Sequence, residues 1–190
     1  MWRWRGRSKF AELLERVAGA LDAGGIRYMV VGGQAVLLHG EARLTKDVDV
    51  TLAAGLEHLE KVVSLARAAG LEPLVDPESF TRRTLVLPCQ DRQTGLRVDF
   101  ILSFSPYERQ AIDRARLVTM GRTAVRFATA EDLVIHKMIA GRPRDVEDVK
   151  GVLRKNPGLD RDYVSEWLKR FEEVVGRPLA SEFAAIAAGP

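Results

Sequence analysis

Two short stretches of the sequence place acidic residues between apolar ones, in a pattern that could do metal chemistry. Asp47 and Asp49 lie in the segment TKDVDV, and Asp99 lies in LRVDFI. Acidic and apolar residues that alternate are typical of a β-strand with two different faces. Asp47 and Asp49 therefore share a face, and a neighbouring strand with Asp99 would bring three carboxylates together. Such an all-oxygen set favours two Mg2+ ions, with Mn2+ as the alternative, over zinc.

A pair of glycines precedes the first acidic stretch. The segment VVGGQAVLLHG, residues 30–40, predicts a buried strand, a turn at Gly32 and Gly33, and a short helix. Unpaired backbone N–H groups and the helix dipole make the start of such a helix an anion site. A phosphate site followed by a carboxylate metal site suits phosphoryl or nucleotidyl transfer, in which two ions about 3.5–4 Å apart hold the attacking and leaving oxygens.

The order of these motifs resembles the DNA polymerase beta-type nucleotidyltransferase superfamily. The resemblance rests on the glycine pair, on the spacing Arg43-x-Thr45-x-Asp47-x-Asp49 and on a later strand aspartate. Two further segments, AEDLVIHK at 130–137 and AGRPRDVEDV at 140–149, resemble the downstream motif of the AbiEii-like nucleotidyltransferases. That group includes small bacterial proteins and toxins of toxin–antitoxin pairs. The resemblance covers roughly residues 26 to 155, most of the chain.

The resemblance implies roles for particular residues. It makes Asp47, Asp49 and Asp99 the catalytic carboxylates and the metal ligands. It also implies a nucleotide-binding set that consists of Gly32, Gly33, Arg43, Thr45, Lys137, Arg142 and Asp145. In that set Arg43 would pair with triphosphate oxygens, and the Thr45 hydroxyl would orient a carboxylate. Many superfamily members carry serine at the position of Gly33, so this chain offers only backbone groups there.

Three of these residues have a second interpretation from their local sequence. Arg43 reads equally well as half of a surface ion pair. Asp145 lies in the first turn of a predicted helix, where an acid favours the helix dipole whatever else it does. Lys137 lies near the buried face of its helix, where it either extends its ammonium to solvent or reaches toward a phosphate. We expect Asp145 to position Lys137, Arg142 or the base rather than to bind a metal.

Composition excludes several protein classes. The 190 residues are 46% apolar and 29% charged, as in an ordinary globular chain, and the net charge of +3 is compatible with polyanionic substrates without requiring them. The single Cys89 excludes an intramolecular disulfide and fits a reducing cytoplasm. No apolar run approaches the ~20 residues of a membrane span, so we expect no membrane partner. The basic N-terminal segment, MWRWRGRSK, is either a frayed end or start-site artefact, or a basic aromatic arm that contacts RNA, and we favour the first interpretation.

Periodicity and turn residues predict an α+β fold, with a mixed β-sheet nucleotidyltransferase core flanked by helices. We expect residues 1–127 to form this core, from an N-terminal helix and the sheet, and residues 128–190 to form a C-terminal helical subdomain packed on it. The predicted strands are 26–31, 46–52, 84–87 and 97–102, with a hairpin near Gly121. The predicted helices are 8–23, 105–116, 130–140, 144–155, 161–175 and 179–187, with a further helix that Leu56 to Ala66 mark and that Gly70 ends.

The predicted function is metal-dependent transfer of a nucleoside monophosphate from a nucleoside triphosphate to an acceptor hydroxyl. The AbiEii-like resemblance suggests tRNA or a cognate toxin or antitoxin protein as the acceptor. One alternative is a small-molecule adenylyltransferase of the aminoglycoside or lincosamide type. Another is an antitoxin module that uses the same fold to hold a partner. Resemblance at the level of fold does not select among these acceptors.

Overall fold

The computed structural model of the chain describes residues 8–41, 45, 47–103 and 105–189. Residues 1–7 of the basic N-terminal segment and Arg43 therefore lie outside the described residues. The chain divides into two compact units, Met1–Val31 with Thr45–Phe127 and Gly32–Leu44 with Ala128–Pro190. This division differs from the expected one in a single segment, because residues 32–44 group with the C-terminal helices and not with the sheet.

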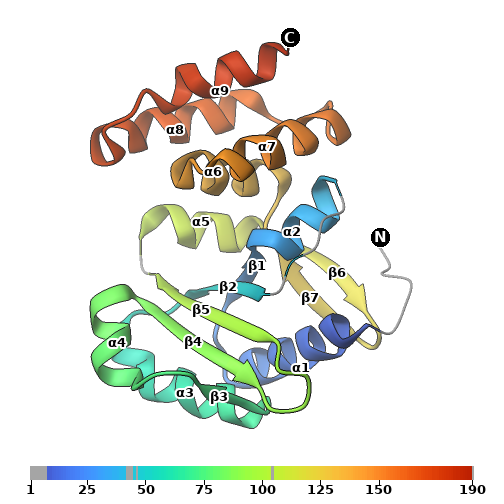
Figure 1. The fold of residues 1–190 in the computed structure, drawn as a ribbon, viewed down its shortest axis with the longest axis vertical. Helices are drawn as coiled ribbons and strands as arrows, with labels where there is room; N and C mark the ends of the chain where they lie inside the picture. Colours follow the sequence, from blue (N-terminus) through green and yellow to red (C-terminus); the bar gives the residue numbers. More distant parts are fainter. Residues whose placement is uncertain (1–7, 42–44, 46, 104, 190) are drawn as a thin grey trace. The chain divides into compact units, whose positions relative to one another are not determined.

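The first unit is built on a mixed sheet, as predicted. Among the described residues this sheet has seven strands in the order β3-β4-β5-β2-β1-β7-β6 (Figure 1). The β2–β5 and β1–β7 pairs are parallel and the remaining pairs are antiparallel. The strands are β1 (Tyr28–Val31), β2 (Asp47–Ala53), β3 (Leu71–Pro73), β4 (Val86–Asp91), β5 (Arg97–Ser103), β6 (Arg116–Met120) and β7 (Thr123–Phe127).

The two faces of β2 differ in their environment. Val48, Val50 and Leu52 are fully buried on one face, whereas Asp47 and Asp49 on the other face are only partly buried. This burial follows the period-two pattern of the sequence, since successive side chains of a strand point to opposite sides. The apolar face faces the core, and the acidic residues are left on the opposite face.

Helices cover both faces of the sheet in the first unit. On the face with the buried valines, α1 packs against α3, and Arg16 of α1 bonds to Asp91 of β4 at 2.8 Å. On the opposite face α5 packs on β2 and β1 (Figure 1). Ser8 begins the first helix as predicted, with its hydroxyl accepting a hydrogen bond from the Ala11 N–H. The helical segments are α1 (Lys9–Ala23), the 3-10 turn η1 (Leu56–His58), α3 (Leu59–Ala68), α4 (Pro77–Thr84) and α5 (Pro106–Arg114).

The region between α3 and β4 differs from the sequence prediction. Thr84, predicted to begin a strand, is the last residue of α4, and the strand begins only at Val86. Leu85 ends the helix in the left-handed conformation with φ 57°. The helix start has a capping aspartate, Asp76, followed by proline, but Thr81 is its one buried residue among those described. Without an apolar stripe, periodicity gave no helix signal.

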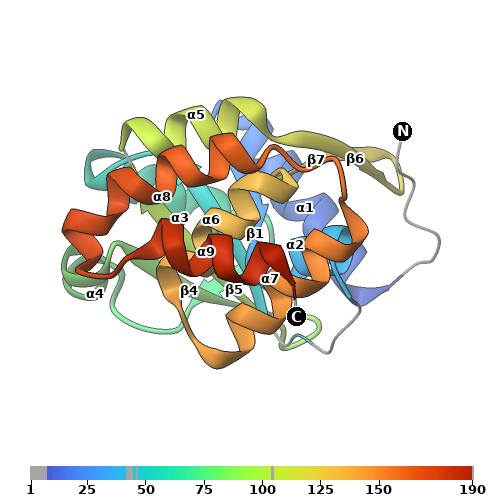
Figure 2. The same cartoon turned by 90° about the horizontal axis from the view of Figure 1, so that it is seen from above.

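The second unit is helical. It contains α2 (Gly32–His39), α6 (Ala130–Ala140), α7 (Pro143–Lys155), α8 (Arg161–Val175) and α9 (Leu179–Ala188). The last two helices lie side by side and run in opposite directions in both views (Figures 1 and 2). The four C-terminal helices predicted from the sequence are thus confirmed, to within one residue at each end. Within the described ranges, no helix has both the length and the apolar composition that crossing a bilayer requires.

Candidate active site

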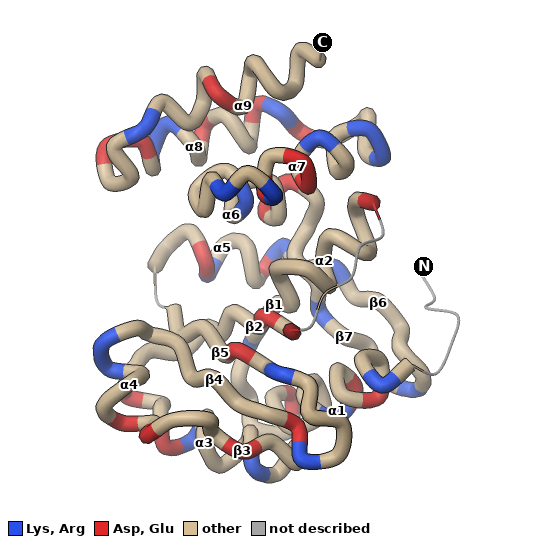
Figure 3. The backbone as a smooth tube through the Cα atoms, in the orientation of Figure 1, with Lys and Arg blue, Asp and Glu red and all other residues tan. Residues whose placement is uncertain are grey.

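The strand that carries Asp99 lies beside the strand that carries Asp47 and Asp49. In the parallel β2–β5 pair, Asp49 is directly opposite Asp99, and Asp47 is opposite Arg97. Residues opposite each other in neighbouring strands project from the same face, about 4.8 Å apart in backbone position. Figure 3 shows acidic positions on these two strands near one another, with a basic position beside them on β5. Three carboxylates and one guanidinium therefore share one face of the sheet.

Arg97 is the immediate partner of the third carboxylate. Its Nε donates to Oδ1 of Asp99 at 2.7 Å. This hydrogen bond raises the pKa of Arg97, and the negative charges of Asp99, Asp47 and Asp49 raise it further, against a smaller opposite effect of burial. The guanidinium thus lies in the combined field of all three acids. The sequence analysis did not select Arg97, although its place two residues before Asp99 puts both on one strand face.

Thr45 contacts the first carboxylate. Its hydroxyl lies 2.9 Å from Oδ1 of Asp47 and 3.2 Å from the carbonyl oxygen of the same residue. A hydroxyl has a single proton, so it donates to one of these oxygens at a time. Either bond restrains Asp47, which is the orienting contact expected of Thr45.

The donor set fits a divalent cation in its chemistry. Asp47, Asp49 and Asp99 offer carboxylate oxygens on one face, which are the ligands that Mg2+ and Mn2+ prefer. Their side chains do not close on one point, because within the described ranges no group of three His, Cys, Asp or Glu residues is placed to hold an ion. The Asp99 carboxylate is instead turned to Arg97. The predicted shared face is present, and the predicted convergence on a single spot is incomplete.

Cys89 lies behind this face and is not a nucleophile. It pairs with Val98 in the β4–β5 ladder and is fully buried. Burial raises the pKa of the thiol to about 12, and the negative charge of Asp99 contributes. A thiol in this state stays protonated at neutral pH.

In the second unit the glycine pair begins α2 directly. Gly32 has φ +60°, a conformation that glycine adopts without the steric cost of a side chain. Gly33 and Gln34 follow as buried residues of the first helical turn. The first backbone N–H groups of a helix have no partner within it, so this start keeps the donors that an anion would use.

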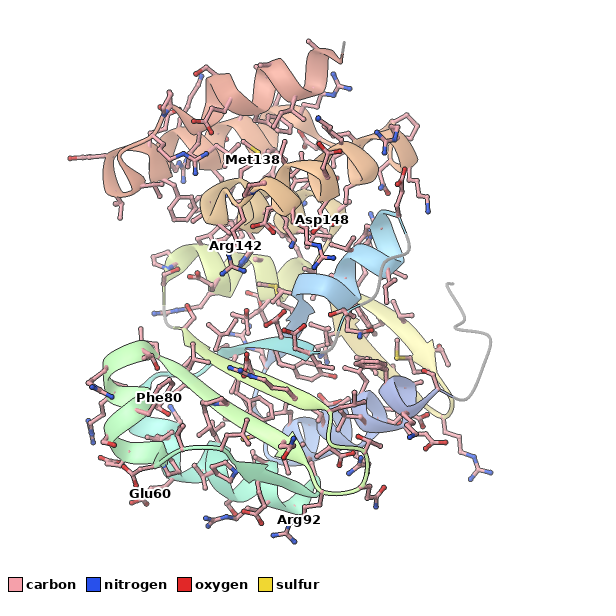
Figure 4. All side chains as sticks on the ribbon, viewed as in Figure 1. Glu60, Phe80, Arg92, Met138, Arg142 and Asp148 are labelled. Atoms are coloured by element: carbon pink, nitrogen blue, oxygen red, sulfur yellow. The ribbon has the colours of Figure 1, made fainter. Side chains whose placement is uncertain are left out.

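Lys137 and two aspartates form a buried ion cluster in the second unit. The Nζ atom of Lys137 lies 2.6 Å from Oδ1 of Asp145 and 2.9 Å from Oδ2 of Asp148, and the lysine side chain is 11% exposed. Asp145 also accepts a hydrogen bond from the backbone N–H of Arg142, the residue before α7, at 3.2 Å. Figure 4 labels Arg142 and Asp148 at this helix. An ammonium has three N–H donors, so two bonds leave one for a further acceptor.

The ion cluster brings two residues of the predicted nucleotide-binding set, Lys137 and Asp145, into contact. It also contains a residue outside that set, Asp148. Asp145 lies against Lys137, as the sequence interpretation anticipated. The pairing of Asp148 with Lys137 joins α6 to α7, and no spacing within one helix could have indicated it. Arg142 is exposed at the start of α7.

Comparisons with known proteins agree with this architecture. Residues 10–179 match the family described as nucleotidyl transferase of unknown function (DUF2204). No curated protein sequence matches the chain. Among solved structures, an antigenic nucleotidyltransferase-like protein from Paracoccidioides brasiliensis is 16% identical with a TM-score of 0.56, and the match covers 93% of this chain and 92% of that chain.

Two further structural neighbours are antibiotic-modifying proteins. ANT(2″)-Ia, solved in complex with adenylyl-2″-tobramycin, is 14% identical with a TM-score of 0.58, covering 94% of this chain and 98% of its own. The lincosamide antibiotic adenylyltransferase LnuA, lincomycin-bound, is 12% identical with a TM-score of 0.52, covering 74% of this chain and 94% of its own. At such identities the likeness shows a shared fold. The family match spans most of the sequence, and the chain therefore belongs to this nucleotidyl transferase family.

Proposed function

We propose that this chain transfers a nucleoside monophosphate from a nucleoside triphosphate to an acceptor hydroxyl and releases pyrophosphate. The observation that carries the proposal is the position of Asp49 opposite Asp99, with Asp47 on the same face. Family membership gives the reaction class. Since the substrate is a nucleoside triphosphate, we place the reaction in the cytoplasm.

The three carboxylates would hold the divalent ions, Mg2+ or alternatively Mn2+. When bound, such ions neutralise phosphate charge and orient the reacting oxygens. Asp99 would also take the proton of the attacking hydroxyl. Arg97 bonds to Oδ1 of Asp99, so the guanidinium would compete with a metal ion for this carboxylate. Thr45 would keep Asp47 oriented throughout.

The nucleotide-binding roles remain proposals that follow from the superfamily resemblance. The backbone of Gly32 and Gly33 would bind phosphate oxygens at the start of α2. Lys137, held by Asp145, would offer its remaining donor to a phosphate. Arg142 and Arg43 are the other candidate phosphate ligands.

The acceptor has two candidates. The AbiEii-like resemblance of residues 130–149 supports tRNA or a protein in a toxin–antitoxin setting, and a partner-binding antitoxin is the non-enzymatic form of that idea. The second candidate is a small molecule. It is supported by the fold shared with ANT(2″)-Ia bound to adenylyl-2″-tobramycin and with LnuA bound to lincomycin.

The test is calorimetric titration of the protein with each nucleoside triphosphate, with Mg2+ and with EDTA. We compare wild type with the double variant Asp47→Asn/Asp49→Asn and with Glu60→Gln, an exposed acid on α3, as a matched control. Metal-dependent binding of at least one triphosphate that the double variant loses and the control keeps supports the proposal. A well-folded wild type that binds no triphosphate refutes it and favours the partner-binding module.

A further inference from the structure

Four buried side-chain polar atoms in the first unit, of Thr51, Thr81, Glu108 and Arg126, have no hydrogen-bond partner among the described residues. Two of these four atoms belong to the strand β2 and to the helix α5. They are the hydroxyl oxygen of Thr51 and the Oε2 oxygen of Glu108. A buried polar group without a partner costs free energy comparable to a lost hydrogen bond, so such atoms are uncommon in folded proteins. Neither residue has a role in the nucleotidyltransferase site as described so far.

Thr51 lies on the face of β2 that carries the acids. It follows Asp49 by two residues, so both side chains project from the same side, about 7 Å apart along the strand. Its side chain is 1% exposed, and its partner in the next strand is Ile101. The Thr51 hydroxyl therefore lies on the same face of the sheet as the three carboxylates, at a point where another element covers this face.

The cover is α5, which packs on β2 and β1 from this side. Its buried residues are Tyr107, Ala111 and Ile112, which mark the stripe that faces the sheet. Glu108 precedes Ala111 by three residues and Ile112 by four, so it lies on the same stripe. The Ser105 hydroxyl accepts a hydrogen bond from the Glu108 N–H at 3.2 Å and fixes the start of the helix. The Glu108 carboxylate thus has one oxygen buried at the interface between α5 and the sheet.

The chemistry of the two groups selects a kind of ligand. A carboxylate accepts hydrogen bonds, and a hydroxyl can donate or accept one. A phosphate group would be repelled by Glu108 and by the three aspartates on the same face. A hydroxyl or amino group would instead satisfy both atoms. This pair therefore suits the acceptor molecule and not the triphosphate.

We propose that Glu108 and Thr51 form an acceptor subsite under α5, which binds a hydroxyl or amino group adjacent to the one that reacts. Glu108 is here a positioning residue, because it orients the acceptor and does not touch the reacting atoms. The inference rests on the proposed function, in which the acceptor hydroxyl meets the carboxylates of β2 and β5.

The first experiment compares wild type with Glu108→Gln, Thr51→Val and Asp113→Asn. Asp113 lies on the same helix, where it forms an exposed ion pair with Arg27, and serves as the matched control. The acceptors are tobramycin, lincomycin and unfractionated tRNA, each with labelled triphosphate and Mg2+. We expect a rise of about tenfold or more in the KM for whichever acceptor is used, the scale of one lost hydrogen bond. We expect the kcat to change less and the Kd for triphosphate to stay within about twofold of wild type.

Two results would overturn the subsite. One is an unchanged acceptor KM in Glu108→Gln, and the other is a loss of triphosphate affinity that matches the loss of acceptor affinity. The control should behave like wild type in every assay. Circular dichroism melting of each variant shows whether the fold has survived.

A second measurement does not depend on turnover. The probe is Tris, which carries three hydroxyls and one amino group, titrated against protein with 13C-labelled glutamate side chains. The Glu108 carboxyl resonance, assigned by its loss in Glu108→Gln, should shift with Tris in wild type and in Asp113→Asn, and less in Thr51→Val. No shift would overturn the subsite. A shift in a protein that binds no triphosphate would keep the subsite while the proposed function fails.

Discussion

Asp49 of β2 lies directly opposite Asp99 of β5, in a parallel pair of strands where Arg97 donates to Asp99. Neighbouring strands are about 4.8 Å apart, so two like charges face each other at short range. Strands disfavour aspartate, and two facing aspartates add electrostatic repulsion. Two facing aspartates destabilise the fold unless a cation offsets the repulsion between their carboxylates. In this structure the cation is a guanidinium, and in the proposed reaction it is a metal ion.

Replacing Asp49 with asparagine should abolish transfer and leave the fold intact. The amide removes one metal ligand and one of two facing negative charges, so activity is lost while the repulsion is relieved. We expect transfer to fall by at least about 100-fold, the scale on which one electrostatic contact to a transition state is felt. The thermal midpoint should not fall.

Labelled-triphosphate transfer and thermal melting measure the two effects, with Asp113→Asn as the control. Transfer by Asp49→Asn at the wild-type rate would contradict the carboxylate mechanism. Unfolding of the variant would mean that the carboxylate is structural.

The shared face of Asp47 and Asp49 could be predicted because its signal is local. Asp47 and Asp49 alternate with buried valines, and the Asp91–Gly95 turn brings the Asp99 strand back along the chain. In that turn the side chain of Asp91 accepts a hydrogen bond from the Thr94 N–H at 3.1 Å, which is ordinary turn chemistry. The period put Asp47 and Asp49 on one face, and the turn paired the Asp99 strand with β4. The parallel pairing that brings Asp99 beside Asp49 joins segments far apart in the sequence, so no local signal indicated it.

Other features could not be predicted, because they depend on contacts with residues distant in the sequence. Asp148 looks like a first-turn acid until Lys137 of another helix is placed against it. Glu108 lies in PYERQAIDR, a segment polar enough to read as exposed, and only packing on the sheet buries its carboxylate oxygen. Helix α4 has capping residues but no apolar stripe. In each case tertiary contacts decided what local propensity left open.

Replacing Arg97 with methionine should tighten the binding of Mg2+. The guanidinium and the metal compete for the Asp99 carboxylate, so removing the guanidinium frees a ligand and removes a positive charge from the site. We expect a several-fold lower Kd for Mg2+ in calorimetric titration at low ionic strength. Arg92→Met, which removes an exposed arginine from the nearby turn, should leave the Kd unchanged. Weaker Mg2+ binding by Arg97→Met would show that Arg97 supports the metal site and does not compete with it.

Stability should fall at alkaline pH because two buried acids keep their protons in the folded state. Burial raises the pKa of Cys89 from 9.0 to about 12 and that of Tyr28 from 10.0 to about 12. Above the unfolded values the unfolded chain releases protons that the native protein retains, so unfolding becomes more favourable as pH rises. The stabilisation is complete below about pH 9 and is lost between pH 9 and 12.

Urea unfolding at intervals from pH 8 to 11 measures this dependence. Cys89→Ala should reduce the slope between pH 9 and 10, where the unfolded thiol ionises first, and should leave the Tyr28 contribution at higher pH. Equal slopes in the variant and the wild type would show that the native thiol ionises as readily as the unfolded one.

Lys137 should be essential to the stability of the second unit. Its ammonium is the charge partner of Asp145 and Asp148, whose side chains are each 6% exposed, so Lys137→Met leaves two buried carboxylates without that partner. Breaking a buried ion pair by removing one partner costs about 3–5 kcal/mol. We expect a loss of that order in urea unfolding. Lys150→Met, which removes an exposed pair with Glu147 at 2.8 Å, should cost no more than about 1 kcal/mol.

The combined variant Lys137→Met/Asp145→Asn/Asp148→Asn separates charge from packing. If uncompensated carboxylates cause the loss, neutralising them should restore much of the stability, and a mutant cycle should show strong coupling among the three sites. Additive losses would mean that Lys137 acts through its packed methylene chain. In that case its ammonium would be available for a phosphate, and Lys137→Arg should then retain triphosphate binding.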